Sequence, residues 1–201
     1  MKRPAQGFTL MELMVVLAIA ATVLAIGAPS FGEFRRNNRL TGIANDYLGS
    51  LLLARTEAIK QQTNVAVCAS LNPASAAATC SAAANFTGWI VFVDTNNDCQ
   101  RNGADVILRG DGPIDPNVNA PSNGACISFS ANGFTQPIVG GFVRADRNLF
   151  CDDRGKALQA GTALSAARGI MTWPTGRSLI TRETGAAGPQ NLNDAAWGAC
   201  P

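Results

Sequence analysis

Histidine is absent from the 201-residue chain. This excludes mechanisms that need an imidazole, including Ser-His-Asp and Cys-His catalysis and the usual catalytic zinc sites. Charged residues are also scarce, at 15% against the roughly 25% typical of soluble domains. The chain has 16 basic and 14 acidic residues, so its net charge is small. It therefore lacks the strong charge that would indicate a protein that binds nucleic acid or a membrane surface. We therefore expect a protein that is not an enzyme, because the sequence supplies no combination of nucleophile, base and oxyanion donor.

Cysteine is present as an even set without any Cys-x-x-Cys pair: Cys68, Cys80, Cys99, Cys126, Cys151 and Cys200. Such a set favours disulfide bonds, and hence an exported chain, over a cytosolic metal or redox protein. The sequence alone does not choose among the possible pairings. Nearness in the chain suggests Cys68 with Cys80 and Cys151 with Cys200.

The amino terminus offers a route of export. Lys2 and Arg3 precede an apolar stretch, and no charged residue occurs in the 20 residues from Leu13 to Gly32. At about 1.5 Å per residue this length can cross a hydrocarbon core of about 30 Å. An ordinary signal peptide is the alternative, but its apolar region is shorter, about 7–15 residues, and does not contain a carboxylate such as Glu12. The basic residues place the amino end in the cytoplasm and the rest of the chain outside.

The string GFTLMEL, from Gly7 to Leu13, resembles the class III signal of type IV pilins and type II secretion pseudopilins. The resemblance implies that a prepilin peptidase cleaves between Gly7 and Phe8 and methylates the new amino group of Phe8. It also implies that Glu12 pairs with the amino-terminal ammonium of a neighbouring subunit and sets the register of helix stacking. Cleavage removes Lys2 and Arg3, which leaves 14 basic and 14 acidic side chains.

Hydrophobic spacing predicts one long helix over about residues 9–62, with Pro29 bending or melting it locally. Its first part, residues 8–29, is expected to lie in the membrane or filament core, and its amphipathic part, residues 30–62, to pack on a β-rich domain over residues 63–201. The fold class is therefore α+β, with a long helix against a mostly antiparallel sheet. Candidate strands are residues 64–69, 88–94, 105–109, 125–129, 141–145, 148–151, 167–173 and 177–181.

Further strings resemble the GspH/FimT-type minor pilins: Leu53–Lys60, Gly88–Asp94, Ile107–Arg109, Cys151–Gly155 and Thr175–Arg177. The resemblance implies a type IV pilin-like fold and a subunit that primes or modifies assembly of a type IV pilus or a type II secretion pseudopilus. It implies as partners other pilin or pseudopilin subunits, the prepilin peptidase, the inner-membrane assembly platform and, through residues 8–29, membrane lipid. The expected location is the bacterial inner membrane, with the globular domain in the periplasm, and then the filament.

DNA is a second possible partner, because some FimT-type members bind DNA in natural transformation through a GRxR motif. Here Gly176 and Arg177 are followed by Leu179 where the second arginine is expected. Arg177, Arg182 and Arg168 are the candidate DNA-binding residues. Phosphate binding needs several convergent cations, so solvated arginines without a DNA site are the alternative interpretation.

Calcium is the one cofactor that the sequence suggests. Asp94, Asn96, Asp98 and Asp105 supply oxygen atoms at positions 1, 3, 5 and 12 of a calcium-type loop. The glycine expected at position 6 is Cys99, and the last ligand is Asp instead of Glu. The alternative is a hairpin turn in which the Asn and Asp side chains accept backbone hydrogen bonds.

Overall fold

The computed structural model contains one long helix, seven strands in two sheets and a short 3-10 helix in the part of the chain that it describes. The chain divides into two units, Met1–Asn38 and Arg39–Pro201, which we describe separately. The mixed helix and antiparallel sheet architecture confirms the α+β class expected from the sequence. The described residues are 7–81, 86–103, 105–120, 126–137, 147–159, 161–185 and 190–200, without the side chains of 26, 28–30 and 196.

Helix α1 (Leu10–Gln61) has nearly the bounds expected from the hydrophobic spacing. It is continuous through Pro29, so the expected local melting is not observed. A proline removes one backbone donor, and the turns around it can keep their own hydrogen bonds.

In the first unit the described large apolar side chains of α1 are exposed. Among the described residues, no helix combines the length and apolarity needed to cross a membrane. A transmembrane segment over residues 8–29, where some side chains are not described, stays a prediction from the sequence.

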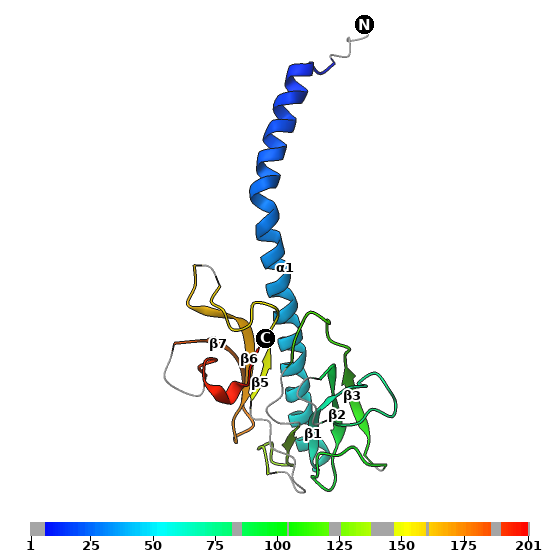
Figure 1. Ribbon diagram of the computed structural model, residues 1–201. Helices are drawn as coiled ribbons and strands as arrows, with labels where there is room; N and C mark the ends of the chain where they lie inside the picture. Colours follow the sequence, from blue (N-terminus) through cyan, green and yellow to red (C-terminus); the bar gives the residue numbers. More distant parts are fainter. Residues whose placement is uncertain are drawn as a thin grey trace. The chain divides into compact units, whose positions relative to one another are not determined.

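In the second unit α1 buries one stripe of side chains at alternating steps of four and three residues, which is the spacing of one helix face. Three of its members are alanines, and these allow a sheet to approach the helix closely. The stripe packs into the main core with residues of both sheets, which Figure 1 draws on either side of this part of the helix. Its members are Leu40, Ala44, Tyr47, Leu51, Ala54 and Ala58.

The first sheet has the antiparallel order β3-β2-β1-β4 and is buried on both faces at its centre. Since side chains alternate along a strand, Val65, Val67 and Ala69 of β1 face the main core, whereas Ala66 and Cys68 face away from it. The strands are β1 (Val65–Ser70), β2 (Gly88–Val93), β3 (Ile107–Asp111) and β4 (Cys126–Phe129).

The face of the first sheet that points away from the main core is covered by two loops, each held by a disulfide bond. Cys68 bonds to Cys80 and Cys99 bonds to Cys126. Cys68 and Cys126 lie opposite each other in the pairing of β1 with β4, so the two loops are fixed to adjacent points of the sheet. Together with Ile90, Phe92 and Ala78, the cysteines form a second, smaller core cluster.

The second sheet has the order β5-β6-β7 and is covered in the same way. Phe150 and Ile170 face the main core, while Leu149, Ala167 and Met171 face a carboxyl-terminal segment, residues 190–200, which we call the strap. The strap buries Leu192 and Trp197 and is held by the bond between Cys151 and Cys200. The elements are β5 (Arg147–Phe150), β6 (Leu164–Thr172), β7 (Ser178–Glu183) and the 3-10 helix η1 (Ala195–Trp197).

The two suggested disulfide pairings, Cys68 with Cys80 and Cys151 with Cys200, are confirmed. Seven of the expected strands have counterparts in the structure, shifted by a few residues at their ends. The eighth, residues 141–145, lies outside the described residues.

A polar relay that begins in the core and ends at the surface joins α1 to the first sheet. The indole N–H of Trp89 donates to the Ser50 hydroxyl over 2.9 Å, and that hydroxyl lies 2.8 Å from a carboxylate oxygen of Asp111. Arg109 forms an ion pair with Asp111 at 2.7 Å. Because β2, β3 and α1 each supply a member, the relay fixes the edge strand β3 against the helix.

Replacing Gly169 tests how closely the strap packs. A Cβ atom at this position would lie 2.5 Å from Leu192 and 2.7 Å from the Trp197 ring. We expect Gly169→Ala to lower the free energy of unfolding by about 1–3 kcal/mol through overpacking, measured as a lower midpoint of thermal unfolding. The matched control is Gly185→Ala, where nothing lies within 4 Å of the added atom. Equal midpoints for the two variants would contradict this packing.

Candidate functional site

The amino-terminal segment leaves the expected cleavage site accessible. Gly7 has nothing within 4 Å of its Cβ position, and Phe8 is 85% exposed. The helix begins only at Leu10. The Gly7–Phe8 bond therefore precedes the helix in an open stretch of chain.

Thr9 caps this helix. Its hydroxyl accepts a hydrogen bond from the backbone N–H of Glu12 over 3.2 Å, which is the usual role of threonine at a helix start. The Glu12 side chain is exposed, and its carboxylate has no hydrogen-bond partner among residues 7–81 or elsewhere in the described chain. It is available for a cation from another molecule. The sequence signal for the cap was the Thr-x-x-Glu spacing, which we interpreted only as part of the processing motif.

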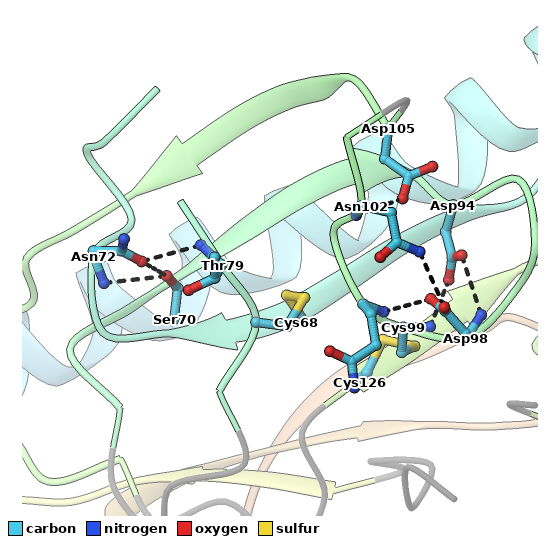
Figure 2. The surroundings of a disulfide bond; sticks show 12 residues. Cys68, Ser70, Asn72, Thr79, Asp94, Asp98, Cys99, Asn102, Asp105 and Cys126 are labelled. Carbon is cyan, nitrogen blue, oxygen red and sulfur yellow. Dashed lines mark hydrogen bonds between the residues drawn. A yellow bond between two sulfur atoms is a disulfide. The ribbon is translucent and has the colours of Figure 1, made fainter. Parts of the chain in front are cut away.

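The second candidate site is the loop between β2 and β3, shown in Figure 2. The Asp94 carboxylate accepts hydrogen bonds from the backbone N–H groups of Asp98 and Cys99, at 3.2 and 2.9 Å. Asp98 in turn accepts from the side chains of Asn96 and Asn102, at 2.8 and 3.0 Å. Asp105 accepts from the backbone N–H of Asn102 over 2.9 Å.

The electrostatics of this loop follow from these contacts. Burial raises the pKa of the Asp94 carboxyl, although the backbone N–H groups of Cys99 and Asp98 act in the opposite direction. For Asp98, burial also acts to raise the pKa, but hydrogen bonds from Gln100, Asn102 and Asn96 outweigh it and lower the pKa. The hydrogen bonds to the loop carboxylates are those that the hairpin interpretation predicts, and at Asp98 they outweigh the effect of burial.

The calcium hypothesis gains no support from this arrangement. Within the described ranges, no group of three or more Asp, Glu, Cys or His side chains is placed to hold a metal ion. Asp94, Asp98 and Asp105 accept hydrogen bonds from the loop itself, and the Asn96 amide donates to Asp98.

The three candidate DNA-binding arginines do not form one exposed cluster. Arg168 is 4% exposed, and its guanidinium donates to the carbonyls of Ala166 and Ala167 and to the Thr41 hydroxyl. Burial, followed by the charges of Arg182 and Arg154, lowers the pKa of Arg168 to about 10. The assignment of Arg168 to a surface DNA site is therefore wrong, because β6 directs this side chain towards α1.

Arg182 and Arg177 differ in their exposure to solvent and in their contacts. Arg182 is half-buried and donates to the Ser165 carbonyl over 3.1 Å and to the Gln159 side chain. Arg177 is exposed and lies over the ring of Trp173, 5.6 Å from its centroid. Of the three candidates, only Arg177 presents its charge to solvent.

Sequence reasoning missed a groove beside β3, which we call the β3 groove. Residues 73–76 line one side, and Arg101, Gly103, residues 105–107 and Gly110 line the rest of a hollow of about 720 Å³. The only signal in the sequence was a single arginine in a loop otherwise rich in Asn and Asp.

A long amino-terminal helix with an exposed Gly-Phe bond and a free glutamate, followed by a disulfide-bonded β domain, defines the pilin-like class of filament subunits. Residues 2–28 match the model of the prokaryotic N-terminal methylation motif. Residues 44–159, more than half of the chain, match the model of type II transport protein GspH. The chain belongs to the GspH family and is a minor pilin or pseudopilin of a type IV pilus or a type II secretion system.

Two solved structures are similar, both of the type IV minor pilin FimU of Pseudomonas aeruginosa. One crystal form has 16% identity and a TM-score of 0.44, and the match covers 73% of this chain and 91% of that one. The other has 15% identity and a TM-score of 0.41, and the match covers 70% and 91%. No curated protein sequence matches the chain.

Calcium addition tests the loop between β2 and β3. Because the loop carboxylates already accept hydrogen bonds, we expect calorimetry on the full chain to give no binding heat, even at calcium concentrations far above the roughly micromolar range of sensor loops. Magnesium serves as the control for nonspecific charge effects. A saturable heat with calcium alone, lost in Asp98→Asn, would restore the metal site.

Proposed function

We propose that this GspH-family chain primes or modifies the assembly of its filament. After cleavage between Gly7 and Phe8, the helix enters the filament core, and the globular unit contacts other minor subunits at or near the tip. Heterologous, head-to-tail contacts of this kind produce open filaments and not closed rings.

The observation that carries this proposal is the segment from Gly7 to Glu12. An exposed Gly-Phe bond ahead of the helix suits a peptidase, and an unpaired Glu12 carboxylate suits a cationic amino terminus on a neighbouring subunit. A carboxylate in an apolar helix bundle is costly unless a cation compensates it, so Glu12 favours one register of stacking. The match to the methylation motif over residues 2–28 supports the same processing.

The partners follow from this role. They are the prepilin peptidase, the inner-membrane assembly platform, and other pilin or pseudopilin subunits. Before assembly, residues 8–29 hold the chain in the inner membrane, with the globular unit in the periplasm; afterwards they lie in the pilus or pseudopilus. The family consists of structural subunits, so no catalytic activity is part of the proposal.

A clean deletion tests the assembly role. We expect fewer filaments and loss of the function that the filament serves, scored in parallel as pilus number, twitching, protein secretion and DNA transformation. Complementation with Glu12→Ala should give a cleaved protein that does not restore assembly, whereas Gly7→Val should leave the uncleaved precursor. Immunoblots that resolve precursor from mature chain make this distinction.

The wild-type gene is the positive control, and a variant of the exposed residue Leu158, Leu158→Ala, controls for expression. If all four phenotypes are unchanged by the deletion, the assembly role is wrong.

A DNA receptor on the same filament is the second candidate, favoured by one observation. Arg177 places an exposed cation beside the Trp173 ring, a combination that suits stacking and phosphate contact. Against it, Arg168 and Arg182 already donate hydrogen bonds within the protein.

The double variant Arg177→Ala/Arg182→Ala tests this second function. We expect it to retain DNA at low salt to the same extent as the wild type, because one exposed cation neutralises too few phosphates for a site. A gel-shift titration over a salt series measures the retention, and the single variants Arg177→Ala and Arg109→Ala are compared as a charge-matched pair. A loss seen with Arg177→Ala and not with Arg109→Ala would favour the DNA receptor.

A further inference from the structure

We propose that the β3 groove binds an extended, carboxylate-bearing peptide segment of a neighbouring filament subunit. The groove lies beside a strand at the edge of its sheet. β3 is an edge strand of the first sheet, paired with β2 on one side, and none of the strands in the described ranges pairs with its other side. Such an edge can accept a further strand through backbone hydrogen bonds.

Disulfide bonds and close packing hold the walls of the groove. Residues 73–76 lie in the loop closed by Cys68 and Cys80, and Arg101 follows the bond from Cys99 to Cys126. Pro73 is buried against Gly88, Gly110 and Gly112, where an added Cβ atom would meet it within 3 Å. A groove with walls held in this way loses little conformational freedom when a ligand binds.

Within the described ranges, the groove contains a cationic side chain without a partner. Arg101 is half-buried in the groove, and in the described part of the chain no hydrogen bond or ion pair reaches its guanidinium. The other charged residue of the groove, Asp105, is buried and already accepts hydrogen bonds from Asn102 and Thr95. The groove therefore presents one unpaired cation, whose best partner is a carboxylate.

An exposed apolar side chain lines the same groove as this cation. Val106 lines the groove and is 60% exposed, although it directly precedes β3. Arg101 and Val106 suit an extended peptide that has both an acidic and an apolar residue. The acidic side chain would pair with Arg101, and the apolar one would cover Val106. That combination favours a peptide over a nucleic acid, since a phosphate backbone would gain nothing from Val106.

Two blocked synthetic peptides of alternating valine and threonine, one with a central glutamate and the other with glutamine, test this inference on the full chain in detergent micelles. We expect the glutamate peptide to bind about tenfold more tightly. We also expect it to shift the backbone amide resonances of residues 101–110. Arg101→Gln should remove the difference between the peptides, and Arg177→Gln, which changes an exposed arginine outside the groove, should preserve it.

Val106→Asp provides an independent variant, which should weaken the glutamate peptide more than the glutamine peptide. Equal affinity of both peptides for the wild type, resonance shifts confined to other surfaces, or displacement of the peptide by a single-stranded oligonucleotide would each overturn the proposal. The statement that the segment belongs to a neighbouring filament subunit rests on the proposed assembly function. The peptide assay requires no filament, so its failure is distinguishable from a failure of that function.

Discussion

The helix stripe from Leu40 to Ala58 is the surface against which both sheets are built. Its steps of four and three residues present one continuous apolar face, and the alanines in it let the strands approach closely. Tyr47 contacts both sheets edge-on, with ring centroids 5.1 Å from Trp89 and 5.6 Å from Phe150. Since the sheets meet through this face, a change in the stripe would affect both of them.

One helix can cover only one face of each sheet, and this constraint explains the disulfide bonds. The outer face of the first sheet is closed by two loops that Cys68–Cys80 and Cys99–Cys126 hold, and that of the second by the strap that Cys151–Cys200 holds. These segments are rich in Ala, Gly and Asn and bury few large side chains, of which Leu192 and Trp197 of the strap are two. Each crosslink lowers the entropy of the unfolded chain and contributes roughly 2–4 kcal/mol.

The sequence predicted the elements better than their contacts. The helix bounds and seven strands followed from spacing, because period and burial are local properties. Arg168 was misassigned because basic charge was considered apart from its surroundings, although Ala166, Ala167, Ile170 and Met171 mark a buried strand. No local spacing predicts the bond between Cys99 and Cys126, which joins the loop after β2 to β4; it is left as the third pair only once the two nearer pairs are chosen. The β3 groove depends on two loops 25 or more residues apart, and no local pattern encodes it.

The same crosslinks bear on how a filament subunit can present a specific surface. Residues 2–28 match a general methylation motif, so under the proposed function the globular unit supplies the features that are particular to this chain. Loops that are fixed to adjacent points of a sheet keep one shape, and the glycines at 88, 110 and 112 allow Pro73 to sit directly on the strands. The unpaired Arg101 lies between such loops and favours a ligand that carries a negative charge. Shape and charge together can discriminate one neighbour from another.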